Sequence, residues 1–463
     1  MILSPKLCII ESSRFFNRFL GCLVILLSLT GASFAQDTSS PAPTVNPGDT
    51  TWLLVSSALV LLMTPGLALF YGGMVRGKNI LNMLMQSFIA MSVVTLVWVI
   101  AGYSLAFAKG EGALAPFIGT LAWAGLEGVG QTPHSFYATT APHQSFMIYQ
   151  MMFAIITPAL ISGAIADRMK FSAYIIFIAL WSLLVYSPLA HIVWSEEGFL
   201  LKYGSLDFAG GTVVHISSGI SALVLAIMLG KRNTANEDMR PHNLPMTLIG
   251  AALLWFGWFG FNAGSALASN GLAVSAFVVT HIAAAVAGLT WILIEWVMIK
   301  KPTALGYATG AVAGLVAITP ASGFVKPIPA IAIGCGVSFI CYFAIKLKSR
   351  LGYDDALDVF GVHGVGGIWG AIATGLFAQK SVNAAGADGL FFGGPELLVK
   401  QIVGILFALV MGGVGTFIIG SILKATIGIR VSESEEATGL DITQHGEEAY
   451  PLSSEGALGV PNH

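Results

Sequence analysis

Charged residues are scarce in this chain of 463 residues. Only 10% of the residues are Asp, Glu, Lys or Arg, whereas 55% are hydrophobic, and the mean hydropathy is +0.79. Soluble domains carry about 25% charged residues, so segments this poor in charge cannot all form solvated surface. The composition predicts a chain that is solvated mainly by the lipid bilayer. Its net charge of -2 gives no sign of nucleic-acid binding.

Cysteine is also rare. Cys8 and Cys22 lie in the N-terminal leader, and Cys335 and Cys341 lie six residues apart on one hydrophobic segment. A six-residue step places two side chains on different faces of a helix. The chain therefore has neither a disulfide framework nor a CxxC metal site, and we expect no cofactor.

The N-terminus has the pattern of a secretory signal. Three basic residues precede the apolar run Phe19 to Leu29, and Ser33, Phe34 and Ala35 form a small-residue cleavage site. We predict a signal peptide over residues 1–35, with an uncleaved anchor helix as the alternative. Residues 36–50 then form a short polar extracytoplasmic segment.

Long apolar segments recur through the rest of the chain. Each is long enough to cross a hydrocarbon layer about 30 Å thick, which predicts an all-α polytopic membrane domain over residues 51–425 and a tail over 426–463. The predicted spans lie near residues 51–72, 83–107, 145–165, 171–193, 208–229, 245–262, 272–299, 304–319, 327–347, 359–377 and 397–425.

The basic residues are distributed unevenly between alternate loops. Of the 22 Lys and Arg residues, fourteen lie in one set of loops and the tail, five lie in the other set, and three lie in the leader. Because cytoplasmic loops carry the excess of Lys and Arg, the tail is predicted to be cytoplasmic and the mature N-terminus outside. We expect a multi-pass protein of the cell (inner) membrane.

Three histidines fall well inside predicted spans. A polar group in hydrocarbon costs several kcal/mol unless it finds a partner or a cavity. His281 has no other unusual polar residue around it, so packing or a subunit contact explains it best. His215 and His363 each lie among glycines, which let helix backbones approach closely. Two neutral imidazoles could meet in the bundle, either lining a pore or merely bonding two helices together.

Asp207 and Asp358 precede these two histidines and raise the alternative of a metal site. The step from Asp207 to His215 covers about 12 Å of ideal helix, and the step from Asp358 to His363 turns about 140°. Neither carboxylate easily shares a metal with its histidine. Each aspartate is better placed as a cap at the start of a helix.

Aromatic residues indicate a second candidate site. Phe153 lies midway along one span, Trp194 and Phe261 lie at the outer ends of two others, and Ser265 follows Phe261. Such residues are ordinary in interfacial belts. They would also suit a small cation with N–H donors, because ring faces and a hydroxyl acceptor compensate for lost hydration.

Several long strings resemble the ammonium transporter family (Amt, MEP and Rh proteins), in particular its bacterial members. Together they run from about residue 51 to residue 450. The matching strings are FYGGMVRGKN from Phe70, ADRMKFSA from Ala166, AHIVW from Ala190, LDFAGGTVVHISSGISALV from Leu206, RPHNLPM from Arg240, GWFGFNAGSA from Gly257, TPASGF from Thr319, DVFGVHGVGG from Asp358 and GLDITQHGEEAY from Gly439.

The resemblance implies a fold of eleven transmembrane helices. Two inverted five-helix halves and a final helix would form one pore per subunit of a homotrimer. From the residues alone the repeat stays open, since the two Asp-to-His steps have different lengths, eight and five residues. The family pattern places the two histidines together at the pore centre all the same.

The resemblance also implies roles for the candidate residues. Phe153, Trp194 and Ser265 match an outer site that binds ammonium, and Phe153 and Phe261 match a stacked pore gate. His215 and His363 match the twin histidines of the pore, and Asp207 matches the acid that supports the vestibule. The implied mechanism deprotonates ammonium and passes ammonia through the apolar pore. The acidic tail matches a regulatory segment that a PII-type nitrogen-signalling protein could contact.

Other functions compete with transport. An ammonium sensor with little flux would usually need an output domain, which the short tail does not provide. A channel for urea, carbon dioxide or water would share a narrow apolar pore, but the aromatic and serine residues favour a cation at the mouth. No HExxH or GxSxG string supports an intramembrane enzyme.

Overall fold

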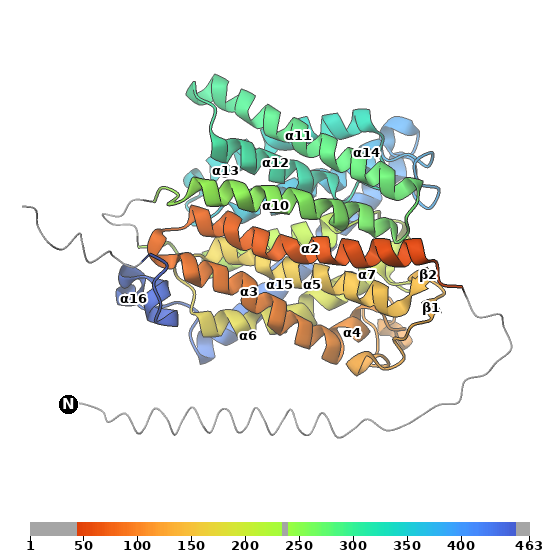
Figure 1. Ribbon diagram of the computed structural model, residues 1–463, viewed down its shortest axis with the longest axis horizontal. Helices are drawn as coiled ribbons and strands as arrows, with labels where there is room; N and C mark the ends of the chain where they lie inside the picture. The colour runs from red at the N-terminus through yellow and green to blue at the C-terminus, as the bar shows by residue number, and fades with distance from the viewer. Residues whose placement is uncertain (1–43, 234–238, 451–463) are drawn as a thin grey trace, which may run out of the picture. The chain divides into compact units, whose positions relative to one another are not determined.

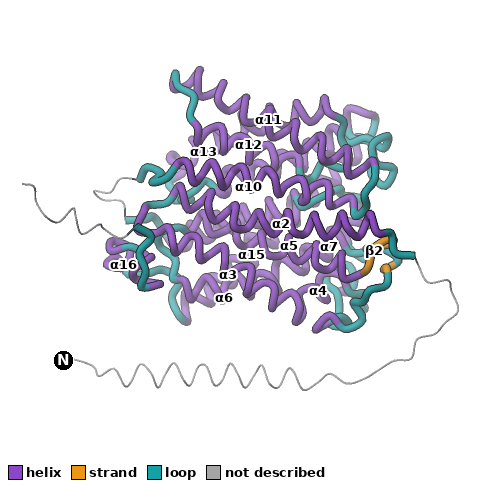
Figure 2. Tube along the Cα trace, viewed as in Figure 1, coloured by secondary structure: helices purple, strands orange, loops and turns teal. Residues whose placement is uncertain are grey.

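The computed structural model describes residues 44–233 and 239–450, and most of these residues are helical. The predicted signal peptide, most of the polar segment 36–50 and the last part of the tail lie outside the described residues. Long helices run side by side in one bundle, with β1 and β2 at one end and α16 at the other (Figures 1 and 2). We call these ends the strand end and the tail end.

The bundle alternates α-helices with short π-helical turns. The α-helices are α2 (Pro47–Met74), α3 (Ile80–Val97), α4 (Tyr103–Phe107), α5 (His143–Ile165), α6 (Phe171–Trp181), α7 (Ser187–Trp194), α8 (Phe199–Tyr203), α9 (Ser217–Leu229), α10 (Leu244–Ala263), α11 (Gly271–Ile299), α12 (Ala304–Ile318), α13 (Pro327–Leu351), α14 (Val365–Phe377), α15 (Pro395–Thr426) and α16 (Glu433–Thr438). The π-helical turns are η2 (Trp98–Gly102), η5 (Ser182–Tyr186), η6 (Gly211–Ile216), η8 (Phe360–Gly364) and η10 (Asp441–His445). Strands β1 (Pro133–His134) and β2 (Ala138–Pro142) pair antiparallel.

Ten helical stretches of the described residues are long and apolar enough to cross a membrane. They correspond to ten of the predicted spans, with ends that mostly agree within a few residues. The remaining predicted span, 304–319, corresponds to α12, whose 15 residues extend only about 22 Å. Because α12 is shorter than the hydrocarbon layer, length and composition alone do not make it a span.

Polar caps set several helix ends. The predicted polar segment was too long at its C-terminal end, because α2 already begins at Pro47. The Asn46 side chain accepts hydrogen bonds from the backbone N–H groups of Gly48 (2.8 Å) and Asp49 (3.2 Å). This Asn cap followed by Pro is a favourable helix start, which hydropathy alone does not show.

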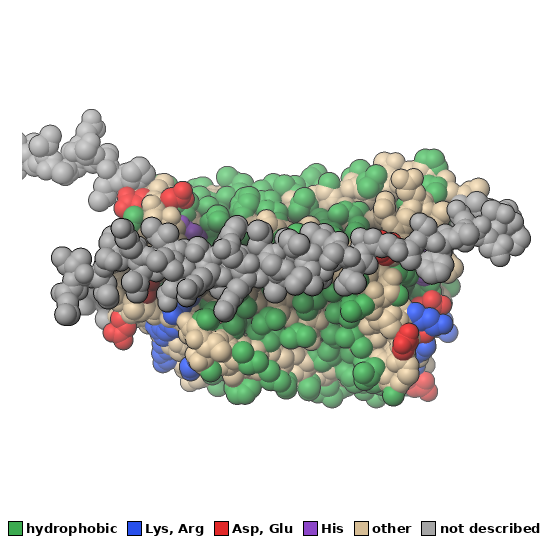
Figure 3. Space-filling model, turned by 90° about the horizontal axis from the view of Figure 1, so that it is seen from below, with side chains coloured by type: hydrophobic (Ala, Val, Ile, Leu, Met, Phe, Trp, Pro, Cys, Tyr) green, Lys and Arg blue, Asp and Glu red, His purple; other side chains and the backbone are tan. Residues whose placement is uncertain are grey.

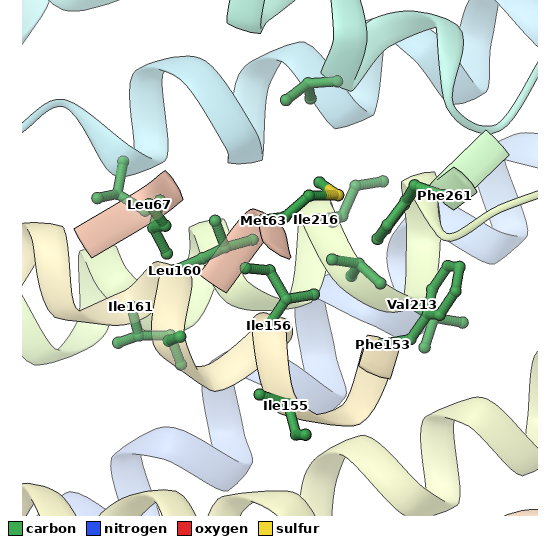
Figure 4. Close-up of a cluster of buried hydrophobic side chains, with 14 of the residues drawn as sticks. Met63, Leu67, Phe153, Ile155, Ile156, Leu160, Ile161, Val213, Ile216 and Phe261 are labelled. Carbon is green, nitrogen blue, oxygen red and sulfur yellow. The ribbon is translucent and has the colours of Figure 1, made fainter. Parts of the chain in front are cut away.

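Hydrophobic and charged side chains are distributed over the surface and the core as expected for a protein solvated by lipid. Hydrophobic side chains cover the middle of the face in Figure 3, and acidic and basic side chains gather at its two ends. Helix α5 lies inside the bundle, and nearly all its side chains are buried. Its apolar residues pack with those of α2, η6 and α10, including Met63, Ile156, Val213 and Phe261 (Figure 4). The fold thus places α5, η6 and α10 around one apolar interior.

Candidate functional site

The two glycine-flanked histidines meet inside the bundle. The Nδ1 atoms of His215 and His363 lie 3.3 Å apart, and the rings are nearly parallel, with centroids 5.3 Å apart. Both side chains are buried. One ring must therefore donate a hydrogen and the other must accept it, which a pair of neutral imidazoles can do.

Each histidine lies on a π-helical turn, His215 on η6 and His363 on η8. A π turn carries an extra residue per turn and is frequent at functional sites. Glycine permits the close approach of these segments, because a Cβ atom on Gly219 would lie 2.3 Å from the Cα atom of Gly364. An ideal α-helix places the two histidines at unequal depths, whereas here they are in contact.

A small cavity lies beside the two histidines in the apolar interior. It has a volume of about 10 Å³, close to the space for one water-sized molecule. Its walls are mostly apolar and include Met63, Leu160 and Phe261 beside the two imidazoles. His215 Nε2 is buried, and no described residue forms a hydrogen bond with it. A small molecule with one N–H donor or acceptor would satisfy this nitrogen.

Two stacked phenylalanines close the interior next to His215. The ring centroids of Phe153 on α5 and Phe261 on α10 are 4.2 Å apart, with an interplanar angle of 25°. Phe261 also stacks on His215 at 6.0 Å. Both phenylalanines are fully buried, so a solute could pass this point only if the rings moved.

Trp194 and Ser265 lie beyond this ring pair. Trp194 presents its ring at right angles to Phe153, with centroids 6.2 Å apart, and its Nε1–H donates to the Asp207 carbonyl at 2.9 Å. The Ser265 hydroxyl donates to the Phe261 carbonyl at 2.9 Å. Trp194, Phe153 and Phe261 thus form a continuous aromatic series that leads to His215.

Tyr149, which was not predicted from the sequence, supports this site. Its hydroxyl contacts the carbonyl oxygen of Phe261 at 2.8 Å and Ser265 Oγ at 3.1 Å, and its ring packs edge-on against Phe153. Tyr149 lies four residues before Phe153 and therefore on the same face of α5. This four-residue spacing from Phe153 was the signal in the sequence that could have identified Tyr149. A fully buried tyrosine here fixes both the phenylalanine pair and the serine.

Asp207 caps the start of η6 at the strand end. Its two carboxylate oxygens accept hydrogen bonds from the backbone N–H groups of Gly210, Gly211, Thr212 and Val213, at 2.6 to 3.1 Å. Burial raises the pKa of Asp207 to about 6, although these four bonds act in the opposite direction. Asp207 therefore orients the turn that carries His215.

The predicted helix cap at Asp358 was wrong. Asp355 accepts from the backbone N–H groups of Val359 and Phe360, at 3.0 and 2.7 Å, and so caps the segment that carries His363. Asp358 instead has a left-handed backbone (φ 59°) and forms an ion pair with Lys348. It lines a cavity of about 160 Å³ at the tail end, which also reaches His363.

His281 lies apart from this site. Its imidazole is exposed on α11 and packs beside Trp255, with centroids 5.4 Å apart. The two explanations proposed from the sequence, packing and a subunit contact, both fit this position. Among the described residues, no group of three or more His, Cys, Asp or Glu side chains is arranged to hold a metal ion.

The tail packs against the tail end of the bundle. Asp441 accepts from the backbone N–H of Asn82 at 2.8 Å, and the Leu440 N–H donates to the Asn79 side chain at 2.7 Å. Arg430 pairs with the buried Glu436 at 2.8 Å. These contacts hold the tail across the start of α3.

An ion-pair network lies beneath the tail and predicts a pH effect. Arg232 bonds the Asp354 carboxylate at 2.8 to 3.0 Å. Burial raises the pKa of Asp354, but the bonds to Arg232 outweigh that effect and hold it at about 2. The pKa of Asp354 is higher in the unfolded chain than in the folded protein. The carboxylate therefore stabilises the fold above about pH 4, and this contribution is lost as the pH falls toward 2.

We expect Asp354→Asn to lower the melting temperature at pH 7. The difference in melting temperature between this variant and the wild type should shrink between pH 5 and pH 3. Thermal unfolding in detergent checks this, and a pH-independent difference would contradict it.

Comparison with known proteins decides the family. The model of the Ammonium Transporter Family matches residues 51–450. The chain belongs to the ammonium transporter family. An ammonium transporter of Bacillus subtilis is 54% identical over 404 residues, which are 87% of this chain and 98% of the relative. The family assignment predicted from the strings is confirmed.

Solved structures of the family agree with this result. The crystal structure of Saccharomyces cerevisiae Mep2 superposes with a TM-score of 0.80 at 36% identity and covers 87% of this chain and 97% of its own. A sensor Amt protein superposes with a TM-score of 0.77 at 28% identity, covering 86% and 98% of the two chains. The family's function is transport rather than catalysis, and the apolar helices fit a multi-pass membrane protein.

Proposed function

We propose that the protein conducts ammonium nitrogen through a pore that contains the His215–His363 pair. The observation that carries this proposal is a pair of buried imidazoles in contact, beside a cavity of about 10 Å³ with mostly apolar walls. Such a cavity suits a molecule the size of ammonia and disfavours a hydrated ion, whose desolvation is costly.

Ammonium first docks at the strand end, where Trp194, Phe153 and Ser265 lie together. Ring faces stabilise a partly dehydrated cation by about 2 kcal/mol or more per contact, and the serine oxygen accepts an N–H hydrogen bond. The cation then transfers its proton to a water molecule at the mouth, and ammonia passes Phe153 and Phe261 when their rings move. The proton follows through the imidazole pair and recombines with ammonia at the tail end. The paired imidazoles offer a donor and an acceptor to the neutral molecule, and they supply groups suited to a proton relay.

The same proposal extends to the number of membrane helices, their arrangement and the oligomeric state. Helix α12 would complete a set of eleven membrane helices, arranged as two inverted five-helix halves and a final helix, α15. The π turns that carry the two histidines support the repeat, since each follows an aspartate-capped loop. The protein would work as a homotrimer in the cell (inner) membrane, with the strand end outside and the tail in the cytoplasm.

A PII-type nitrogen-signalling protein is the proposed partner at the tail end. The ordered tail lies over the inner loops, and the cavity lined by Asp358 and His363 opens at that end. A loop inserted there would block release of ammonia.

Two other functions remain distinct alternatives. The similarity to a sensor Amt protein favours an ammonium sensor with little flux as the second candidate. A channel for another small solute would need no cation site at the mouth.

Ammonium-evoked current separates these functions. The full chain is reconstituted in liposomes on a solid-supported membrane and exposed to an ammonium jump, with protein-free liposomes and a sodium jump as controls. We expect a saturable current with ammonium only. No ammonium-dependent current or internal pH change from an intact oligomer would overturn transport in favour of sensing. Flux of labelled urea without an ammonium response would support the other channel.

Replacing Trp194 should weaken ammonium binding more than it slows transport. Trp194→Ala removes one ring face from the cation, and we expect about a tenfold higher half-saturating ammonium concentration. Trp296→Ala is the matched control, because Trp296 is exposed on α11. An unchanged half-saturation in Trp194→Ala would exclude a cation site at this ring.

A further inference from the structure

A second cavity lies at the strand end and has no role in the proposed pore. Its volume is about 370 Å³, within the range of small-molecule sites. It is formed where the end of α4, the following loop and β1 meet the loop after Trp194. None of the histidines or phenylalanines assigned to the pore lines it.

Aromatic side chains form part of its wall. The Tyr137 ring is buried and packs nearly perpendicular to Trp123, with centroids 6.4 Å apart. The Tyr137 hydroxyl donates to the Phe107 carbonyl at 2.9 Å and accepts from the Glu196 backbone N–H at 3.2 Å. These bonds fix the ring relative to the acidic loop. His134 and Phe146 stack on the Tyr137 ring, with centroids 4.8 and 5.1 Å away, so Tyr137 forms a rigid part of the wall. The half-buried Trp123 ring beside it is the kind of aromatic surface that binds organic ammonium groups.

Charged groups of both signs line the same cavity, Glu196 and Glu197 together with Lys109 and Lys202. Glu197 is oriented by the Gly110 N–H, which donates to one of its oxygens at 2.8 Å. Within the described part of the chain, none of the four charges forms an ion pair within 4.0 Å. Opposite charges that face one cavity without pairing are available to a ligand that carries both signs.

We propose that this cavity binds a small zwitterion of the α-amino-acid class. The ligand's ammonium group meets the carboxylates of Glu196 and Glu197 and the Trp123 ring face, and its carboxylate meets Lys109 and Lys202. Charge-assisted hydrogen bonds to both ends are stronger than neutral ones. A simple cation would be opposed by the two lysines and a simple anion by the two glutamates. Because the lining carries two positive and two negative charges, it favours a zwitterion over a simple cation or a simple anion.

His134, which also lines the cavity, is consistent with this charge balance. Burial lowers its pKa, with Glu196 acting in the opposite direction, so the imidazole is largely neutral at pH 7. It thus adds no third positive charge. The proposed binding needs no transport and goes beyond the proposed function. An occupant would contact the loop directly after Trp194 and so restrain the mouth of the pore.

Three matched ligands test the proposal by isothermal titration calorimetry on the full chain in nanodiscs at pH 7. They are L-valine, which carries both charges, L-valinamide, which carries only the ammonium, and N-acetyl-L-valine, which carries only the carboxylate. We expect saturable binding of L-valine and binding at least about tenfold weaker for the other two. Equal binding of L-valinamide and L-valine would replace the proposal with a cation site. Absence of saturable L-valine binding would overturn it.

Paired substitutions locate the site. Glu196→Gln with Glu197→Gln, and Lys109→Gln with Lys202→Gln, should each weaken L-valine binding by about tenfold. The matched control is Lys326→Gln with Glu396→Gln, two exposed charges that do not line the cavity. If the control weakened binding as much as either cavity pair, the site would lie elsewhere.

Discussion

Replacing either pore histidine is expected to abolish most of the ammonium-evoked current. His215→Ala or His363→Ala removes one member of a pair whose Nδ1 atoms lie 3.3 Å apart, and it leaves the partner nitrogen without its hydrogen bond. A relay through this pair would stop, and groups that transfer protons commonly contribute a hundredfold or more to rate. We therefore expect the current to fall at least about tenfold, measured on solid-supported membranes at constant protein density.

The control for this prediction is His281→Ala. It removes an imidazole from a membrane helix, but that imidazole is exposed on α11 and packs beside Trp255 and Phe259 rather than against the pair. Its current should match that of the wild type. Internal pH recorded at the same time separates two results, because ammonia flux without current would show that only the relay was lost. Wild-type currents in both pore-histidine variants would exclude a role for the pair.

Removing the Asp207 carboxylate should destabilise the protein more than removing any single surface acid. Asp207→Ala leaves four backbone N–H groups at the start of η6 without their acceptor. Each buried donor left unpaired costs about 1–3 kcal/mol, so we expect a loss of roughly 3 kcal/mol or more. Because η6 carries His215, the current should fall as well. Thermal unfolding and size-exclusion chromatography measure the first effect.

A graded series tests whether the hydrogen bonds are responsible. Asp207→Asn keeps one acceptor oxygen and should lie between the wild type and Asp207→Ala. Asp388→Ala is the comparison, since Asp388 accepts a single bond, from the exposed Lys380 N–H at 2.8 Å. If Asp207→Ala and Asp388→Ala had equal melting temperatures, the capping account would fail.

Some features could be predicted because they depend on composition along the chain. Apolar runs report membrane helices directly, since each span must match the bilayer with its own residues. Each of the eleven predicted spans corresponds to a helical stretch of the structure, and ten of these stretches are long and apolar enough to cross a membrane. The exceptions lie at polar ends, as at Asn46, where a side-chain cap rather than hydropathy decides the start of α2.

Other features could not be predicted because they depend on local backbone geometry. Asp358 stands directly before the predicted span, yet Asp355 caps it, because the left-handed turn at Asp358 directs the chain so that the earlier carboxylate faces Val359 and Phe360. Tyr149 was missed because nothing in the local sequence of this apolar helix identifies the groups that its hydroxyl contacts. Its partners, Phe261 and Ser265, lie more than a hundred residues away.

The sequence by itself determined the membrane class, the positions of ten spans and the family, and it named every candidate site residue except Tyr149. Apolar run length, charge placement and long motifs are properties of the chain and need no tertiary contact. The tertiary structure alone decided which residues touch. The meeting of His215 and His363 depends on two π turns and on the close approach of Gly219 to Gly364. The unpaired charges around the second cavity likewise depend on loops that only packing brings together.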